Sequence, residues 1–232
     1  MTGDRWRLWL DGKHSPADNM AIDECLLESA REHLLPVLRI YGWDRPAVTF
    51  GRFQRYPLEL AKQLTPVRRP TGGGVVFHDA DLTYTVVIPA GHRIGKLDRM
   101  ASYRIFHQAM KEHLGVESEL LGESRESEER ATMRCFVSPS RFDLVGPAGE
   151  KYAGAAQRRT RDGILHQGSI RLPRESGGDG LSKRLTEAFR QAFELEYLPW
   201  EPDAAFLEKA AIRSRERYQN ADWNQGKYAA GH

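Results

Sequence analysis

Cysteine, net charge and long apolar runs are all scarce in this sequence of 232 residues. Its two cysteines, Cys25 and Cys135, do not form a metal-type cluster, and without an export signal we expect both to be free thiols. The net charge of +2, from 34 basic and 32 acidic residues, gives no sign of a nucleic-acid-binding surface. No apolar stretch has the length of a signal peptide core or a membrane span. These absences predict a cytoplasmic protein with no metal site, no nucleic-acid partner and no membrane partner.

The composition that is present, with 40% apolar, 28% charged and 9% aromatic residues, is ordinary for a globular protein. A chain of this length can bury a substantial core. It contains no internal repeat and no low-complexity tract, and the charged run at residues 122–130 is predicted to be a surface loop. We therefore expect one domain over residues 1–232.

Hydrophobic periodicity divides the chain into strands and helices. Alternation predicts strands in "WRLWLDG", "PVLRIYGW" and "AVTFGRF", a hairpin formed by "GVVFH" and "LTYTVVI", and an antiparallel meander of "RFDLV", "KYAGAAQ" and "GILHQGSIRL". Helical spacing marks residues 19–35, capped by Ser15 or Asp18, residues 101–114, and later "LSKRLTEAFRQAFELEY" and "AAFLEKAAIRSRERYQ". Strands grouped with helices around them predict an α+β fold with a central mixed, largely antiparallel β-sheet flanked by helices.

The segment "RRPTGGGVVFHDADLTYTVVIP", residues 68–89, is the most unusual in the chain. Its three glycines at 72–74 fit neither a Walker A loop nor the dinucleotide fingerprint. Successive glycines let main-chain N–H groups approach an anion, and Arg68 and Arg69 are suited to grip a phosphate or carboxylate. The alternative is a tight turn with two surface arginines. The polar residues that follow, His78, Asp79 and Asp81, are by themselves typical of structural hydrogen bonds and turns.

Lys151 and Cys135 are the other candidates for chemistry. Lys151 precedes a run of small residues, which suits a ligand lying against a strand with an ammonium at its polar head. The alternative is a surface lysine whose stem lies along the protein. Cys135, in "MRCFVSPSRF", lies beside Arg134 in a polar context that favours the thiolate, whereas Cys25 is better placed in a helix core.

Together these segments resemble the lipoate-protein ligase A/B and biotin ligase catalytic-domain family. The glycine segment looks like the family signature. The segments "NMAIDECLLE", "RIYGWDRPAVTFGRFQ", "KYAGAAQRR", "GILHQGSI" and "ADWNQGKY" resemble other family segments in the same order. The resemblance covers nearly the whole chain and implies a biotin/lipoate ligase catalytic-domain-like fold. The glycine-arginine motif of biotin ligases is absent, and the chain ends too soon for the C-terminal accessory domain that many lipoate ligases carry.

Two branches of the family remain. One resembles ATP-dependent lipoate-protein ligases, which act through lipoyl-AMP. The other resembles octanoyltransferases of the LipM type, which carry the acyl group on a cysteine. The stretch "CFVSPSRFDLVGPAGEKYAGAAQRR" matches the second branch, with Lys151 sixteen residues after Cys135. This branch implies that Cys135 attacks the thioester of octanoyl-acyl-carrier protein and that Lys151 assists, before the acyl group passes to a lysine of a lipoyl domain.

The resemblance and the residue patterns together give a set of predicted site residues. Cys135 and Lys151 are predicted to be catalytic, and the predicted substrate-binding residues are Arg68, Arg69, Gly72, Gly73, Gly74, Val76, His78, Tyr84, Gly154, Ala155, Gln157 and His166. The chain departs from the family pattern at two of its positions. Gln167 stands where the family often has a histidine, which lies one residue earlier here, and Ala155 replaces a serine.

The implied partners are octanoyl-acyl-carrier protein as donor and lipoyl domains as acceptors, either the glycine cleavage H protein or a 2-oxoacid dehydrogenase E2. No cofactor is predicted for a transferase, while ATP and Mg²⁺ belong only to the ligase alternative. A third possibility is a non-catalytic protein that binds lipoyl domains. The joint presence of Arg69, Cys135 and Lys151 argues against it.

Overall fold

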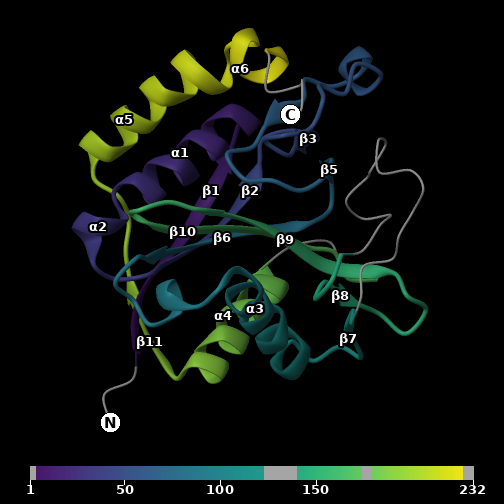
Figure 1. The fold of residues 1–232 in the computed structure, drawn as a ribbon, viewed down its shortest axis with the longest axis vertical. Helices are drawn as coiled ribbons and strands as arrows, with labels where there is room; N and C mark the ends of the chain where they lie inside the picture. The colour runs from purple at the N-terminus through teal and green to yellow at the C-terminus, as the bar shows by residue number, and fades with distance from the viewer. Residues whose placement is uncertain (1–3, 123–139, 174–178, 227–232) are drawn as a thin grey trace.

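The computed structural model describes residues 4–122, 140–173 and 179–226, and its centre is an eight-stranded sheet (Figure 1). In spatial order the strands are β11 (Leu195–Pro199), β1 (Asp4–His14), β2 (Val37–Trp43), β6 (Leu82–Pro89), β10 (Gly163–Ile170), β9 (Lys151–Arg159), β8 (Leu144–Val145) and β7 (Glu119–Leu120). β1 runs parallel to β11 and to β2, and the remaining pairs of this sheet are antiparallel. The predicted α+β class and the meander of β8, β9 and β10 are confirmed.

A second, three-stranded sheet contradicts the predicted hairpin. It consists of β4 (Val67–Arg68), β3 (Ala47–Phe50) and β5 (Val76–His78). β5 pairs with β3, whereas β6 lies in the main sheet between β2 and β10, so the two predicted arms belong to different sheets. All eight residues of β6 are buried, and such a strand needs a long partner on each side. A three-residue β5 cannot supply one.

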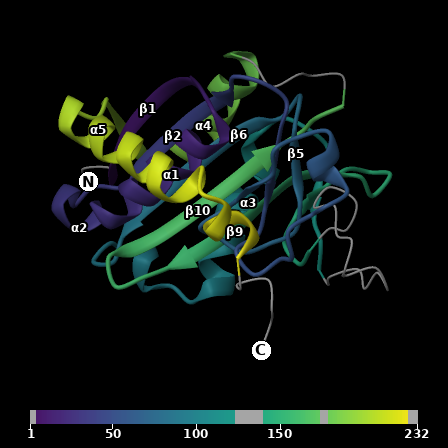
Figure 2. The ribbon, with the colours of Figure 1, turned by 90° about the horizontal axis from the view of Figure 1, so that it is seen from above.

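Helices cover both faces of the main sheet (Figures 1 and 2). α1 (Pro16–Glu28) and α5 (Ala204–Arg213) lie on one face, and Figure 2 shows them crossing above the strands. α3 (Arg99–His113) and α4 (Asp179–Phe193) lie on the other face. The shorter helices are α2 (Ala30–His33), α6 (Ala221–Gln225), the 3₁₀ turns η1 (Leu60–Lys62) and η2 (Ile94–Lys96), and the π-helical turn η4 (Ser214–Tyr218).

Local signals explain where two helices begin and end. Of the two predicted caps, Ser15 is the one that caps α1, accepting a hydrogen bond from the main-chain N–H of Asp18 at 3.2 Å. The prediction that helix continues through residues 195–197 is wrong. Glu194 has a φ of 54°, which ends α4, and the next residues pair with β1 as strand β11. At these residues the hydrogen bonds to the edge of β1 outweigh the helical propensity.

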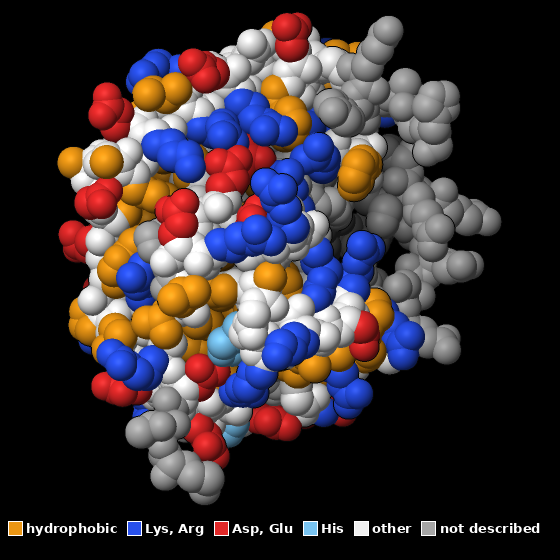
Figure 3. All heavy atoms as spheres, turned by 60° about the vertical axis from the view of Figure 1, so that its left-hand side comes forward, with side chains coloured by type: hydrophobic (Ala, Val, Ile, Leu, Met, Phe, Trp, Pro, Cys, Tyr) orange, Lys and Arg blue, Asp and Glu red, His pale blue; other side chains and the backbone are white. Residues whose placement is uncertain are grey.

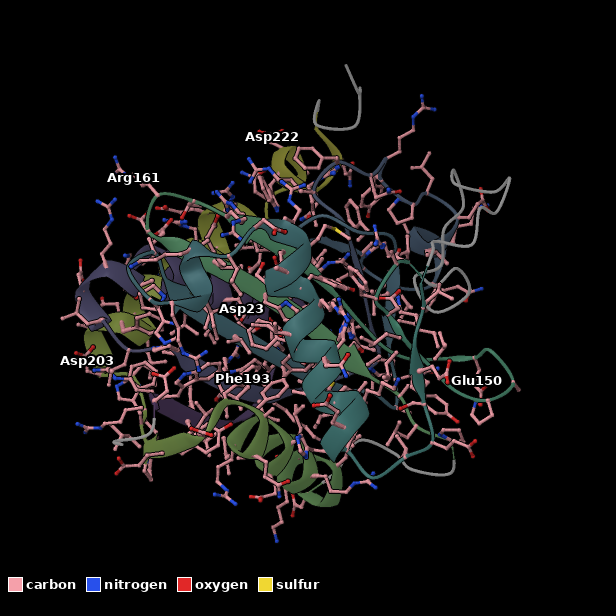
Figure 4. All side chains as sticks on the ribbon, turned by 60° about the horizontal axis from the view of Figure 1, so that its bottom comes forward. Asp23, Glu150, Arg161, Phe193, Asp203 and Asp222 are labelled. Atoms are coloured by element: carbon pink, nitrogen blue, oxygen red, sulfur yellow. The ribbon has the colours of Figure 1, made fainter. Side chains whose placement is uncertain are left out.

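The alternation of β6 divides the interior into two layers, as its sequence predicts. Leu82, Tyr84, Val86 and Ile88 pack into the core beneath α3 and α4, which also contains Phe193 (labelled in Figure 4). The opposite face carries Thr83, Thr85 and Val87 and lies under α1. The face under α1 is therefore partly polar, and it is the face that carries the candidate site.

Basic side chains on the α1 and α5 side are paired with acids. The Glu24 carboxylate, whose side chain is 2% exposed, contacts Arg158 at 2.7 Å, Arg213 at 2.9 Å and Arg217 at 3.2 Å. Arg213 also contacts Glu28. On the face turned forward in Figure 3, Lys and Arg side chains likewise gather beside Asp and Glu side chains. Among the described helices, none is long and apolar enough to cross a membrane.

Candidate functional site

A cleft lies between the main sheet and the small sheet, beside α1. It contains about 470 Å³ of empty space, counting the part open to solvent. Its walls come from α1, β2, β3, β5, β6, β9 and β10, together with the segment after β4. The predicted site residues that line it are Arg69, Val76, His78, Lys151, Gly154 and Ala155. Segments far apart in the sequence thus meet at one cavity.

Lys151 enters the cleft as half of a buried ion pair. Its Nζ lies 2.8 Å from Oδ2 of Asp143, and the two side chains are only 4% and 1% exposed. The burial excludes the alternative of a surface lysine. Gly154 makes room for this arrangement, because a Cβ at that position would lie 2.2 Å from Cε of Lys151. Gly154, the second small residue after Lys151, therefore accommodates the lysine itself.

The Asp143 carboxylate is held by two further donors. The hydroxyl of Tyr103, on α3, donates to Oδ1 at 2.6 Å, and the main-chain N–H of Ser140 donates to Oδ2 at 2.6 Å. Asp143 follows Phe142, whose φ of 68° is rare for a residue with a side chain. His107 of α3 donates from Nδ1 to the Phe142 carbonyl at 2.7 Å, because a carbonyl oxygen can only accept. Burial lowers the pKa of this histidine to about 4 and keeps it neutral. Helix α3 thus fixes the turn that presents Asp143 to Lys151.

Arg69 organises the three glycines. Its Nη2 donates to the carbonyls of Gly72 and Gly74, both at 2.8 Å. Gly73 has a φ of 86°, which favours glycine, and its carbonyl packs where Gly51 has no side chain. Within the described residues, the N–H groups of Gly72, Gly73 and Gly74 donate to no protein acceptor. The segment has the main-chain donors that an anion cradle requires, although its glycines do not line the cleft.

Arg68 faces away from this site. Its side chain is fully buried and donates to four main-chain carbonyls, those of Arg52 and Gln54 at 2.7 Å, Trp223 at 2.9 Å and Asn224 at 2.8 Å. The indole N–H of Trp223 donates in return to the Arg68 carbonyl at 3.0 Å. The two consecutive arginines thus differ: Arg69 serves the glycine loop, and Arg68 fastens α6 to the residues after β3.

His78 lies on the cleft wall within a chain of polar side chains. Its Nδ1 is 2.8 Å from Oδ2 of Asp81, and its Nε2 is 2.8 Å from Oγ1 of Thr49. The Thr49 hydroxyl also accepts a hydrogen bond from Nη1 of Arg69 at 3.0 Å. The imidazole stacks on the ring of Trp43, with 4.0 Å between centroids. Burial alone would raise the pKa of Asp81, but the charge and hydrogen bonds of its neighbours, chiefly His78, hold it below its usual value.

A second buried acid, Asp23, ties α1 to the sheet at the cleft; Figure 4 labels it in the interior of the molecule. Its carboxylate accepts from Arg39 at 2.6 Å, from Thr85 at 2.6 Å, from Gln167 at 2.7 Å and from Tyr41 at 3.0 Å. Gln167, which departs from the family pattern, donates here and accepts from the Thr71 hydroxyl at 2.6 Å. The amide of Gln167 donates to Asp23 and accepts from Thr71 at the same time. A histidine here would need one particular tautomer to make both hydrogen bonds.

Tyr84, Gln157 and His166 lie on the opposite face of the sheet, toward α3. The Tyr84 hydroxyl and Nε2 of His166 are 3.2 Å apart, and Gln157 reaches Nδ1 of the same histidine at 3.0 Å. Burial lowers the pKa of His166 well below its usual value, so it is neutral. The structure places this trio outside the cleft, and its predicted contact with substrate stays a prediction.

The structure describes one of the two cysteines, Cys25. Cys25 is completely buried among the apolar residues of α1, as its sequence position predicts, and burial raises the pKa of its thiol to about 11. Such a thiol is protonated and inert at neutral pH. Cys135 lies outside the described residues, together with most of the charged run at 122–130. Its predicted catalytic role stays a prediction.

Sequence patterns alone did not single out several residues that build the site. The sequence identifies Asp23, Thr49, Asp81 and Tyr103 only as helix, strand or turn positions, and Asp143 only as part of a motif. A polar residue at a position that the helical or strand period assigns to the interior is the signal that would have found Asp23 and Thr49. Asp81 and Asp143 lie in loops, where no periodicity exists to expose them.

Comparison with known proteins identifies the same family that the sequence segments resemble. Residues 15–178 match the model of the lipoyl protein ligase A/B catalytic domain. A protein of Halalkalibacterium halodurans named octanoyltransferase LipM is 38% identical over 182 residues, covering 72% of this chain and 66% of that protein. The LipM octanoyltransferase of Bacillus anthracis is 29% identical over 98% of this chain and its own full length.

The fold is also that of a solved structure. A putative lipoate protein ligase of T. acidophilum with bound lipoic acid superposes with a TM-score of 0.78 at 20% identity, over 96% of this chain and all of that one. At this identity the likeness concerns the fold. The mixed sheet flanked by helices is therefore an architecture that proteins of this kind share.

Proposed function

The chain belongs to the lipoyl protein ligase A/B catalytic-domain family, and we propose that within it the protein is an octanoyltransferase of lipoate assembly. It takes an octanoyl group from a carrier thioester onto Cys135 and passes it to a lysine amine of a lipoyl domain. The observation that carries the proposal is the likeness to curated octanoyltransferases at 29–38% identity. In several of these alignments the matched region spans about two thirds of the relative, 66% in H. halodurans.

Lys151 supports acyl transfer by its environment. A buried carboxylate within 2.8 Å favours the ammonium form of the lysine, because Asp143 stabilises the positive charge where water cannot. An ammonium on the cleft wall stabilises the negative charge that develops on the acyl carbonyl oxygen when a nucleophile attacks. Lys151 therefore acts as a hydrogen-bond donor in the proposed reaction, and it does not need to give up its proton.

The remaining cleft suits the other parts of the substrate. Apolar groups of Met20, Trp43, Val76 and Ala156 are available to an acyl chain, and each buried methylene contributes about 0.8 kcal/mol. Beside the cleft, the glycine N–H groups that Arg69 positions supply donors for a phosphate or carboxylate. In the transferase these N–H groups bind the phosphopantetheine of the acyl-carrier protein or an acidic surface of that carrier.

The two half-reactions differ in energetics. Exchange between two thioesters is nearly balanced in free energy, so loading of the enzyme mainly needs a thiolate, a bound acyl chain and a donor for the developing oxyanion. Transfer to an amine forms an amide, which is much more stable than the thioester and makes the second step effectively irreversible. The proposed donor is octanoyl-acyl-carrier protein and the proposed acceptors are lipoyl domains of the glycine cleavage H protein or of 2-oxoacid dehydrogenase E2. The reaction requires no ATP and no metal, and we expect it in the cytoplasm.

Intact-mass measurement tests this proposal. Incubation with octanoyl-acyl-carrier protein should add one octanoyl group, which Cys135→Ser abolishes and Cys25→Ser retains. Addition of a lipoyl domain should then move the group to the domain. Absence of the adduct on the wild-type protein would contradict the proposal, and release of pyrophosphate from ATP that depends on lipoate would replace it with the ligase activity. Binding of a lipoyl domain with no transfer from either donor would indicate a binding protein.

A further inference from the structure

The segment that follows β3, residues 51–58, holds an aromatic side chain out to solvent. Phe53 is 72% exposed, and within residues 4–122, 140–173 and 179–226 it is the one exposed aromatic side chain. Leu58, at the end of the same segment, is 71% exposed. Single exposed apolar residues are common on protein surfaces, but aromatic side chains are enriched where proteins contact one another.

Buried Arg68 fixes the backbone that carries this aromatic ring. Its Nη1 donates to the carbonyls of Arg52 and Gln54, both at 2.7 Å, so the carbonyls on either side of Phe53 are held from the interior. The N–H of Gln54 donates to the carbonyl of Gly51 at 3.0 Å and closes a turn. The ring is thus presented on a fixed backbone, which reduces the entropy lost when a partner binds it.

The same turn borders the glycine loop. The N–H of Arg52 donates to the carbonyl of Thr71 at 2.8 Å. The backbone of Gly51 packs so closely on that of Gly72 and Gly73 that position 51 has no room for a Cβ. A Cβ at Gly72, in contrast, would meet nothing within 4 Å, so the loop has open space beside it. A ligand bound to the glycine N–H groups therefore lies next to this turn.

Residues 51–58 are positively charged. They contain two arginines, Arg52 and Arg55, and no acid. Arg55 is exposed and pairs with no acid among the residues that the structure describes. Arg68 adds a third positive charge behind the turn, and the groups that accept its hydrogen bonds are neutral carbonyls. Burial lowers the pKa of Arg68, and the nearby charge of Arg52 lowers it further. An acidic protein surface would complement these charges.

The covalent structure of the acyl donor shows which partner fits here. A phosphopantetheine arm is joined through its phosphate to a serine of the carrier protein. With that phosphate on the glycine N–H groups, the carrier surface around the serine must lie against the residues that border the glycine loop. A lipoyl domain has no such phosphate, and its acceptor lysine must reach into the cleft, which residues 51–58 do not line. The position of these residues therefore fits the donor better than the acceptor.

We propose that residues 51–58 are the docking surface for the acidic carrier protein that bears the octanoyl thioester. This inference rests on the proposed function, because it places the donor of that reaction. Phe53 enters an apolar depression of the carrier, and Arg52 and Arg55 contact carboxylates around it. The contact brings the phosphate of the arm to the glycine loop, and the arm leads the thioester into the cleft.

Comparison of two octanoyl donors tests the docking surface. Octanoyl-acyl-carrier protein and octanoyl-pantetheine present the same thioester, but only the first has a protein to dock. Phe53→Ala and Arg55→Glu should each raise the concentration of octanoyl-acyl-carrier protein that gives half-maximal loading by about tenfold, with an unchanged maximal rate. Loading from octanoyl-pantetheine, followed by intact mass, should stay within about twofold of the wild-type rate. Added salt should weaken loading of the wild type from the protein donor only.

The second half-reaction separates the donor from the acceptor. Each variant is loaded at a saturating concentration of octanoyl-acyl-carrier protein, isolated and mixed with a lipoyl domain. Discharge should proceed at the wild-type rate. Leu34→Ala and Arg161→Glu are the matched controls, because Leu34 is 76% exposed and the Arg161 side chain 85% exposed in a different surface pocket. Neither control should alter loading from either donor.

Three results would overturn the docking surface while leaving the octanoyltransferase intact. The first is an unchanged half-maximal concentration of the protein donor in Phe53→Ala or in Arg55→Glu. The second is slower discharge to the lipoyl domain, which would assign residues 51–58 to the acceptor. The third is an equal loss with octanoyl-pantetheine, which would show that these residues support the cleft. A wild-type protein that takes no octanoyl group from the carrier would overturn both the surface and the proposed function.

Discussion

Lys151 and Asp143 form an ion pair that is almost completely enclosed, with 2.8 Å between Nζ and Oδ2. Removal of one charge from such a pair leaves the other buried without compensation, which typically costs about 3–5 kcal/mol. We expect Asp143→Asn to lower the free energy of unfolding by about 3 kcal/mol. It should also slow octanoyl loading of the enzyme, because Lys151 loses the carboxylate that keeps it protonated and correctly positioned. Urea unfolding and intact-mass kinetics measure the two effects.

The control for that change is Asp162→Asn, which removes an acid paired with the exposed Arg31 at 3.1 Å. A pair whose arginine is 59% exposed contributes at most about 1 kcal/mol, so stability and loading should be nearly unchanged. If Asp143→Asn were as mild as the control, Lys151 would not depend on its partner, and the assignment of Lys151 as a fixed donor would be wrong.

Gly154→Ala tests the position of the lysine without changing any charge. The new methyl group would stand 2.2 Å from Cε of Lys151 and 2.3 Å from its Nζ, so the ammonium must move. A displacement of about 1 Å at a catalytic group can cost about 100-fold in rate, and we expect a loss of that order in acyl-enzyme formation. Gly91→Ala is the control, since a methyl group there meets nothing within 4 Å. Equal activity of the two variants would show that the site tolerates a moved lysine.

The two arginines of the glycine segment should respond differently to mutation. Arg68→Lys removes most of the fork that binds four carbonyls, and we expect a loss of about 2–4 kcal/mol in the free energy of unfolding, with little change in the single-turnover rate of the folded protein. Arg69→Lys should instead slow turnover, because the carbonyls of Gly72 and Gly74 lose their common donor. A strong rate defect in Arg68→Lys at unchanged stability would return Arg68 to the substrate site that its sequence predicted.

These arginines also show how far sequence can predict such a site. Periodicity predicts the layers, because burial of β6 and of the meander follows from alternating residues. The sequence placed Arg69, His78, Lys151 and Gly154 in one site, and they do line one cleft. It could not separate Arg68 from Arg69, because the direction of each side chain depends on the distant residues Trp223 and Asn224.

The carboxylate partners of Lys151 and His78 escaped prediction for a related reason. Asp143 and Asp81 act through three-dimensional proximity, and the local pattern around them is that of a strand for Asp143 and of a turn for Asp81. The predicted hairpin failed because a local turn signal at residues 79–81 was outweighed by the pairing that a fully buried β6 requires. Contacts between elements decided both outcomes, and a single sequence contains no direct trace of them.

Cysteine labelling offers an independent check on the assignment of the nucleophile. Burial raises the pKa of the Cys25 thiol to about 11, so almost none of it is thiolate at pH 8. Iodoacetamide should therefore modify Cys135 and spare Cys25 in the folded protein, as peptide mapping will show, and prior octanoylation should block the modification. Labelling of both thiols in urea is the control. Fast modification of Cys25 in the native protein would contradict its placement in the core.

His107 should make stability depend on pH above the range in which carboxylates titrate. Burial lowers its pKa to about 4 in the folded protein, whereas the unfolded chain has the ordinary value of 6.5. Between these values the unfolded state binds the extra proton, so the free energy of unfolding falls as pH decreases from 6.5 toward 4, by about 1.4 kcal/mol per unit for this residue. Above pH 6.5 both states are neutral and the stabilisation is complete.

Urea unfolding between pH 7.5 and 5 measures this slope. His107→Gln keeps a donor for the Phe142 carbonyl but cannot be protonated. Below pH 6.5 its free energy of unfolding should therefore depend on pH less steeply than that of the wild type, by up to about 1.4 kcal/mol per pH unit. His113→Gln, at the end of the same helix and with its side chain 30% exposed, should leave most of the slope in place. If His107→Gln kept the full slope, the imidazole would be protonated in the folded protein. A charged imidazole would then donate the Nδ1–H bond to the Phe142 carbonyl. The strength of this bond, and with it the position of Asp143 beside Lys151, would depend on pH.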